Sequence, residues 1–131
     1  KNISEIVNIV ETMFVSKFGV SQCKILFFSE NHKLNLPRER LKNKTFGKRI
    51  EDLLKQQNNY FGPLAKEDLE YIFENKTVMN EVSLIKLNCI SVSGILIFGS
   101  NMTDKYNPDK GTLFLDFITD ILSKTIDIKN T

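Results

Sequence analysis

The first eighteen residues carry apolar side chains at the spacing of one helix face. The positions follow the i, i+3, i+4, i+7 pattern that is typical of an amphipathic helix. Gly19 follows directly and is expected to end the helix. Two interpretations are open: the stripe packs in the core of this domain, or it pairs with the same helix of a second copy. The stripe consists of Ile3, Ile6, Val7, Val10, Met13, Phe14 and Phe18.

The segment Gly111–Ile128 has the clearest helical pattern in the chain. Its apolar positions form a broad stripe, and the Thr112 hydroxyl can cap the first turn. We therefore predict an amphipathic helix at each end of the domain. The second stripe consists of Leu113, Phe114, Phe117, Ile118, Ile121, Leu122 and Ile126.

Three apolar runs between these helices predict the main strands of a sheet. Cys23–Ser29 and Gly94–Gly99 are short and apolar on both faces, as strands in the middle of a sheet are. Val82–Leu87 precedes the second of these runs, and the connection Asn88–Ser93 has the length of a hairpin loop. The last two strands are therefore expected to pair antiparallel.

Weaker patterns predict four further elements. Positions 34–36 can form an edge strand, and Asn58–Leu64 a second one that ends in a turn. The apolar positions of Arg38–Gln57 predict a helix, and the pattern is clearest from Thr45 onward, because Gly47 weakens its middle. A shorter helix is predicted over Lys66–Asn75. The basic residues near the first of these helices are expected to face solvent: Lys42, Lys44, Lys48 and Arg49.

Helices at both ends and a hairpin between them predict an α+β domain with a central antiparallel sheet. The 131 residues are the length of one domain, and a hydrophobic content of 41% indicates a packed core. No apolar run reaches about 18 residues, so no membrane partner is predicted. The net charge of +2 excludes a strongly basic surface, so no direct nucleic-acid partner is predicted.

The chain has two cysteines, Cys23 and Cys89, and one histidine, His32. Two cysteines without a secretory leader are typical of reduced thiols, so we expect a cytoplasmic protein. A single histidine and two thiols argue against a metal site. The chain begins at Lys1 rather than Met, and we expect it to be part of a longer protein.

The most specific motifs lie near the final helix. Gly99-Ser100 ends the last apolar run, and Tyr106, Pro108 and the run Gly111-Thr112-Leu113-Phe114-Leu115 follow. In this pattern the chain resembles a GAF-like bacterial family of uncharacterised function, the domain-of-unknown-function family numbered 484. Three positions depart from the family: Met102 stands where an acidic residue is usual, with Asp104 two positions later, Phe61 stands for Cys, and Lys86 for Pro.

The resemblance implies one GAF-like (PAS/profilin-like) domain over residues 1–131. It implies an antiparallel sheet with the N- and C-terminal helices packed on one face, and loops and short helices enclosing a possible pocket on the other. The helix over residues 1–18 would continue an upstream coiled coil. Membership of the GAF group implies signalling through small-molecule binding or a homodimer that pairs through the terminal helices.

Six residues are candidates for binding this unidentified small molecule. The two aromatic residues could stack on a planar ligand, and the serine after Gly99 offers a hydroxyl at the pocket rim. The Asp104 carboxylate, in the segment that follows this serine, would complete the site together with Ser83 and Ile85 of one strand. Each also has a purely structural interpretation, as turn, loop or core residue. The candidates are Tyr60, Phe61, Ser83, Ile85, Ser100 and Asp104.

Catalysis has little support in the sequence. The chain contains no G-x-S-x-G, H-E-x-x-H, G-x-x-x-x-G-K-[ST] or G-x-G-x-x-G motif, so we predict no enzyme, no cofactor and no metal. The favoured hypothesis is a non-catalytic regulatory domain that binds a small molecule and dimerises. One alternative is a protein-interaction scaffold with a self-filled pocket, linked to the tyrosine recombinase whose gene often neighbours the family. The other is a small thiol enzyme that uses Cys23 and Cys89.

Overall fold

The computed structural model describes residues 2–18, 22–29, 36, 38–55, 57, 59–73, 81–100 and 112–129. Within these residues the chain forms one sheet of five strands in the order β2-β1-β5-β4-β3. All neighbouring strands pair antiparallel except β1 and β2, which pair parallel at Phe27 and Phe28. The strands are β1 (Gln22–Phe28), β2 (Leu41–Lys42), β3 (Asn59–Gly62), β4 (Glu81–Lys86) and β5 (Ser93–Ser100).

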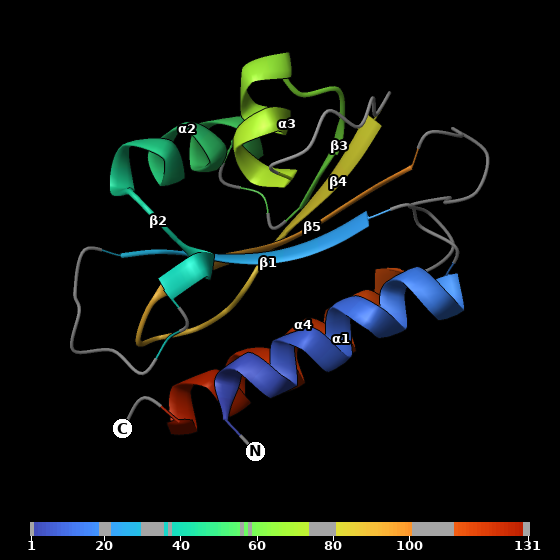
Figure 1. Ribbon diagram of the computed structural model, residues 1–131, viewed down its shortest axis with the longest axis vertical. Coiled ribbons are helices and arrows are strands. Elements are labelled where there is room, and N and C mark those ends of the chain that lie inside the picture. Colours follow the sequence, from blue (N-terminus) through green and yellow to red (C-terminus); the bar gives the residue numbers. More distant parts are fainter. Residues whose placement is uncertain are drawn as a thin grey trace.

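Helices cover both faces of this sheet (Figure 1). The helices α1 and α4 lie side by side on one face, which we call the terminal-helix face, and both chain ends lie at the same end of this pair. The helices α2 and α3 cover the other face, which we call the α2/α3 face. The helices are α1 (Ile3–Phe18), α2 (Lys44–Leu54), α3 (Lys66–Phe73) and α4 (Thr112–Lys129), with a 3-10 turn η1 at Arg38–Arg40.

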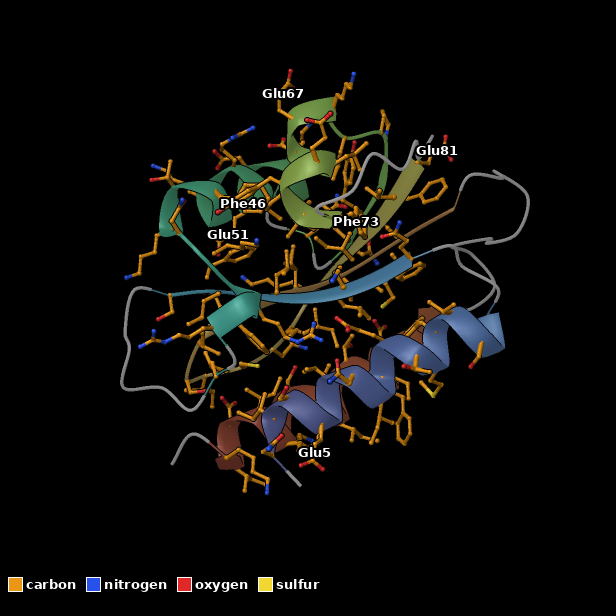
Figure 2. All side chains as sticks on the ribbon, viewed as in Figure 1. Glu5, Phe46, Glu51, Glu67, Phe73 and Glu81 are labelled. Carbon is orange, nitrogen blue, oxygen red and sulfur yellow. The ribbon has the colours of Figure 1, made fainter. Side chains whose placement is uncertain are left out.

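Each face of the sheet carries its own hydrophobic core. Val7 of α1 and Ile126 of α4 are fully buried against β1 and β5 on the terminal-helix face. Ile50 of α2 and Ile72 of α3 are buried on the α2/α3 face. Figure 2 shows Phe46 and Phe73 directed from these helices toward the sheet, whereas the exposed Glu67 points away from it. The two amphipathic layers therefore bury their apolar sides against opposite faces of one sheet.

The α+β class and the placement of the terminal helices on one face are confirmed. The two central strands and the hairpin of β4 and β5 also lie where the sequence predicts them. The central antiparallel sheet is confirmed for β1, β5, β4 and β3, and the short β2 pairs parallel to β1 at the edge, so the sheet as a whole is mixed. The predicted edge strand over 34–36 is not formed at Leu36, while positions 34 and 35 lie outside the described residues.

The predicted helix over Arg38–Gln57 begins later than its apolar pattern indicates. Asn43 caps α2, because its side-chain oxygen accepts a hydrogen bond of 2.8 Å from the Phe46 N–H. The residues before this cap form η1 and β2 instead. The chain therefore reaches α2 along the edge of β1, and this route places Lys44 beside the end of the sheet.

Candidate functional site

The structure separates Tyr60 from the other described candidate residues. Tyr60 packs against the core of the α2/α3 face, and its hydroxyl donates a hydrogen bond of 2.8 Å to the Pro63 carbonyl. Phe61 is the next residue of β3 and is 43% exposed. Because successive side chains of a strand point to opposite faces, these two aromatic residues cannot stack on one ligand from the same side.

Phe61, Ser83 and Ile85 share the terminal-helix face. Phe61 is the partner of Ser83 in the register of β3 and β4, and Ile85 lies two residues along β4. Ser83 and Ile85 are 5% and 6% exposed, and Ile85 belongs to the core below α1 and α4. The structure thus brings Phe61 and Ser83 together, at a place where the neighbouring residues form core. Their role in ligand binding stays a prediction.

The side chains of the other two candidates, Ser100 and Asp104, lie outside what the structure describes, so their position relative to the other four is not defined. Ser100 ends β5, but its side chain lies outside what the structure describes. Asp104 and its neighbour Met102 also lie outside the described residues. Whether Asp104 replaces the acidic residue of the family therefore stays a prediction as well.

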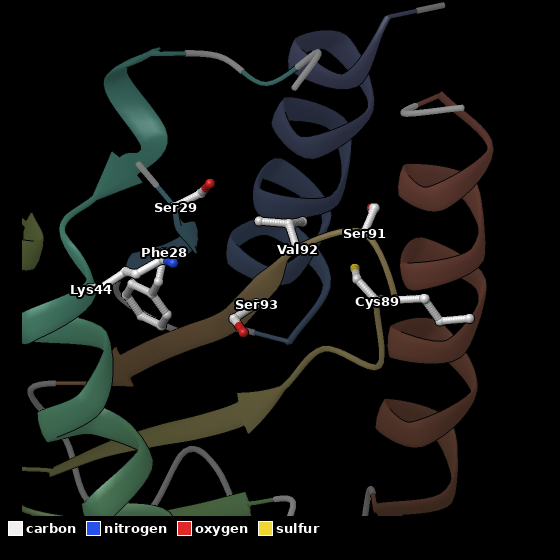
Figure 3. A pocket seen from close by; sticks show the side chains of 8 residues that line it. Phe28, Ser29, Lys44, Cys89, Ser91, Val92 and Ser93 are labelled. Atoms are coloured by element: carbon white, nitrogen blue, oxygen red, sulfur yellow. The ribbon is translucent and has the colours of Figure 1, made fainter. Parts of the chain in front are cut away.

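A pocket of about 350 Å³ lies at the end of the sheet where β1 ends, α2 begins and the β4–β5 loop turns. None of the four candidates whose side chains the structure describes lines it. Figure 3 shows the lining side chains coming from three separate segments of the chain, with the terminal helices behind the loop. The lining residues are Phe28, Ser29, Lys44, Cys89, Ile90, Ser91, Val92 and Ser93.

Asp127 of α4 holds the loop that forms one wall of this pocket. Its carboxylate accepts hydrogen bonds from the N–H groups of Ile90 (2.8 Å) and Ser91 (2.9 Å) and from the Ser91 hydroxyl. Burial opposes ionisation of the carboxyl, but these hydrogen bonds outweigh burial and hold the pKa of Asp127 below its ordinary value. One turn earlier, the Ser123 hydroxyl accepts a hydrogen bond of 2.8 Å from the Asn88 N–H. The pocket loop is therefore anchored to α4.

Lys44 is the single charged side chain among the described residues that line the pocket. It lies in the first turn of α2, where the free N–H groups and the helix dipole add positive potential. That turn contains no acidic residue, and no described residue forms an ion pair with Lys44. Cys89 adds no negative charge at neutral pH, because burial and the nearby Asp127 raise the pKa of its thiol to about 11.

A buried ion pair ties α1 to the sheet on the terminal-helix side. Both terminal nitrogens of the Arg40 guanidinium donate to the Glu11 carboxylate, and Nη2 also donates to the Asn8 side chain at 2.7 Å. The same carboxylate accepts a hydrogen bond of 2.7 Å from the Ile25 N–H, and Arg40 donates to the Ile25 carbonyl at 3.3 Å. These side chains occupy the backbone edge of β1 beyond the short β2, so their role is structural.

The sequence did not single out Lys44, the β4–β5 loop or the Arg40–Glu11 pair as functional or buried. The sequence predicts Lys44 on a solvated helix face, and Lys44 is indeed exposed. No local pattern connects Glu11 with Arg40, which is 29 residues away. The helix start near Thr45 was the one usable signal. A helix that begins there carries Lys44 in its first turn, close to the end of an adjacent strand.

The two thiols lie at opposite ends of β1. Cys23 is the second residue of the strand and is buried, while Cys89 lines the pocket beside the last residue, Phe28. Phe28 lies five positions after Cys23 along the extended strand, which corresponds to about 17 Å. Burial raises the pKa of Cys23 far above its ordinary value, and the Glu11 carboxylate adds to this effect. Both cysteines are free thiols, and this geometry gives no support to a reaction that needs the two side by side.

Fold and site together define an α+β domain with helices on both faces of a mixed sheet and an open pocket at one sheet end. None of the described helices is long and apolar enough to cross a membrane. The model of the family described as "Protein of unknown function, DUF484" matches residues 1–129, so the chain belongs to this family. The family predicted from the sequence motifs is therefore confirmed. A search of the curated proteins found no match.

Proposed function

We propose that this chain is a non-catalytic, GAF-like regulatory domain that binds a small molecule and pairs with a second copy through its terminal helices. The observation that carries the proposal is an apolar stripe on the outer face of α4. Phe117, Ile121 and Ile128 are 61%, 49% and 71% exposed. Their spacing of four and seven residues places them on one side of the helix.

This stripe faces away from the core that α4 already covers. Thr119, Leu122 and Ile126 are at most 3% exposed and lie on the side of α4 that faces the sheet. A helix on the surface of a monomer normally carries polar residues on its other side. On α1, Ile9 is 51% exposed and adds a further apolar side chain to the terminal-helix layer. Aligned exposed apolar residues of this kind are typical of a protein–protein interface.

The charges beside the stripe favour a second copy of the same chain. Asp120 and Lys124 lie one helical turn apart, on the two sides of Ile121 along the helix, and both are exposed. When two copies of α4 pair antiparallel about a two-fold axis near this point, Asp120 of one copy lies beside Lys124 of the other. The interface is then complementary to itself, as a symmetric dimer requires.

The pocket at the sheet end supports the ligand-binding half of the proposal. Its volume of about 350 Å³ lies in the range of small-molecule sites. The non-catalytic assignment is supported by the two separated and protonated thiols and by the absence of catalytic motifs from the sequence. A bacterial cytoplasmic setting is part of the same proposal and rests on the family resemblance and on the free cysteines.

One observation favours the alternative, a scaffold whose pocket is filled by its own side chains. The space between the sheet and α2/α3 is occupied by a cluster of buried apolar residues that includes Phe28, Phe46 and Phe73. A ligand that binds on this face would have to displace part of that cluster. The scaffold would then serve protein contacts alone, with a tyrosine recombinase as the candidate partner.

Light scattering coupled to size-exclusion chromatography tests the pairing. The unaltered chain at about 100 μM is expected to elute with twice the mass of a monomer. This concentration lies above the dissociation constants that are typical of modest apolar interfaces. Ile121→Lys places a charge in the stripe and should raise the dissociation constant by at least about tenfold. Ile90→Lys is the control outside α4, because Ile90 is 96% exposed on the β4–β5 loop.

Two results would contradict the proposed dimer. A monomeric unaltered chain at this concentration would exclude pairing through α4. Equal loss of the dimer in Ile121→Lys and Ile90→Lys would show that any added surface charge has the same effect, so the stripe would not be the interface. Circular dichroism of both variants checks that each still folds.

A further inference from the structure

The sheet-end pocket has the charge of an anion site. Lys44 is exposed at its rim, and neither its ammonium nor the Ser93 hydroxyl has a hydrogen-bond or ion-pair partner among the described residues. Figure 3 shows the Lys44 nitrogen beside the Phe28 ring, on the side that faces Val92 and Ser93. Among the described residues no carboxylate belongs to the lining, since Asp127 lies behind the loop and is engaged by Ile90 and Ser91.

The other lining residues fall into two groups, an apolar wall and a set of polar side chains. Phe28 and Val92 are 5% and 7% exposed, so their side chains are held rigidly by the cores beneath them. The Ser93 hydroxyl and the protonated thiol of Cys89 can donate hydrogen bonds without adding negative charge, whereas the Ser91 hydroxyl already donates to Asp127. A few polar groups on an apolar wall are the usual composition of a site for a small organic molecule.

Charge and size limit the ligand. The single cation that the described part of the lining contains matches one anionic group, and the volume of about 350 Å³ is at the lower end of small-molecule pockets. A highly charged nucleotide would exceed both limits. A compact molecule with one carboxylate and an apolar part satisfies both of them.

We propose that this pocket binds a small organic carboxylate, with its anionic oxygens at the Lys44 ammonium and the Ser93 hydroxyl and its apolar part against Phe28 and Val92. The inference rests on the ligand-binding half of the proposed function and is independent of the pairing of two copies. It places the ligand at the sheet end, away from Tyr60, Phe61, Ser83 and Ile85.

Nitrogen-15 NMR titrations with sodium benzoate and with benzamide test the proposal. The two probes have nearly the same shape, but benzamide is neutral, so their difference measures the contribution of the charge. Benzoate is expected to shift the amide signals of Lys44, Val92 and Ser93 in a saturable way with a dissociation constant of about 1 mM. Benzamide is expected to bind at least about fivefold more weakly, because it forms no charge-assisted hydrogen bonds.

Two variants assign that difference to one side chain. Lys44→Met keeps the length of the side chain and removes its charge, so it should reduce benzoate affinity to the level of benzamide. Lys48→Met is the matched control, because Lys48 is exposed one turn further along α2 and does not line the pocket. The control is expected to bind benzoate as the unaltered chain does. Both residues are exposed, and the amide spectra report whether each variant is folded.

Several outcomes would overturn the assignment. These are the absence of saturable shifts, equal binding of benzoate and benzamide, and equal losses in Lys44→Met and Lys48→Met. A thermal-shift screen with a metabolite panel separates this failure from failure of the proposed function. A stabilising metabolite whose effect survives Lys44→Met would refute the carboxylate site and leave a ligand-binding domain. If no metabolite in the panel stabilises the chain either, the ligand-binding half of the proposed function falls too.

Discussion

Gly47 shows how one missing side chain positions the wall of the pocket. It lies inside α2 and is buried against β1. A Cβ atom at this position would lie 2.6 Å from Cγ and 2.8 Å from Cβ of Phe28, which is closer than packed atoms approach. The glycine weakens the helix intrinsically, but it lets α2 approach the strand end at Phe28. The helix start and Lys44 thereby lie next to the pocket.

Replacing Gly47 by alanine should destabilise the protein. Alanine improves helix propensity by about 1 kcal/mol, whereas forcing a methyl group into a packed site costs about 1–3 kcal/mol, so we expect a net loss of about 1 kcal/mol. Urea unfolding measures the change. Lys48→Ala on the exposed side of the same helix is the control and should stay within about 0.5 kcal/mol of the unaltered chain. A Gly47→Ala variant that is more stable than the unaltered chain would contradict this prediction, because it would show that the Phe28 side chain moves aside without lowering the free energy of unfolding.

At the scale of elements, side chains rather than backbone ladders join α4 to the hairpin. Asp127 and Ser123 of α4 accept hydrogen bonds from backbone N–H groups of the β4–β5 loop, and Asp120 accepts one of 3.1 Å from the Asn88 side chain. All three lie on the side of the helix next to this loop. The helix that carries the outer apolar stripe therefore also holds one wall of the pocket, so the two proposed sites share α4.

Asp127→Asn should weaken the contact between α4 and the β4–β5 loop, and the size of this effect should depend on pH. The folded state lowers the pKa of Asp127, so the ionised carboxylate stabilises the fold fully above the unfolded pKa of about 3.9 and progressively less as the pH falls through the folded value. We expect the midpoint of thermal unfolding to fall by about 3 °C at pH 7. The difference from the unaltered chain should begin to close below the unfolded pKa of about 3.9 and shrink further as the pH falls through the lowered folded value.

Asp116→Asn provides the control for this pH dependence. Asp116 is exposed on the same helix, and no described residue bonds to its carboxylate. Its replacement should leave the pH profile of stability unchanged. A gap between Asp127→Asn and the unaltered chain that stays constant from pH 7 to pH 2 would contradict a role for the ionised carboxylate.

At the scale of the whole molecule, the proposed dimer depends on charges that belong to two copies at once. Asp120→Lys would place Lys beside Lys124 of the second copy on both sides of the two-fold axis, so we expect the dissociation constant to rise roughly tenfold. The double variant Asp120→Lys with Lys124→Asp restores opposite charges across the axis and should recover most of the dimer. Analytical ultracentrifugation at low salt measures both constants.

The double variant also serves as the internal control. Asp120→Lys removes the hydrogen bond from Asn88 in both proteins, so recovery in the double variant cannot come from that contact. The effect should shrink in 1 M salt, where exposed charges are screened. A double variant that dimerises no better than the single one would show that Asp120 and Lys124 do not meet across an axis.

The helices, the central strands and the family could be predicted because their signals are local. Ile3 and Phe14 repeat at helical spacing, and the two-sided apolar run of β5 indicates a strand with neighbours on both sides, as the structure confirms. The strand β2 has only Leu41 and Lys42, too few residues for any periodic signal. The pocket could not be predicted either, since Phe28, Lys44 and the β4–β5 loop are distant in the sequence.

The number and type of the main elements, the near-neutral charge and the family all follow from the amino-acid sequence, because each is a property of single residues or of short-range order. Which elements meet depends on the tertiary structure. It packed Tyr60 against the core of the α2/α3 face, directed Phe117 and Ile121 outward, and brought Lys44 to the end of β1. The physical reason is that periodicity encodes which side of an element is apolar, whereas the partner of that side follows from the packing of all elements at once.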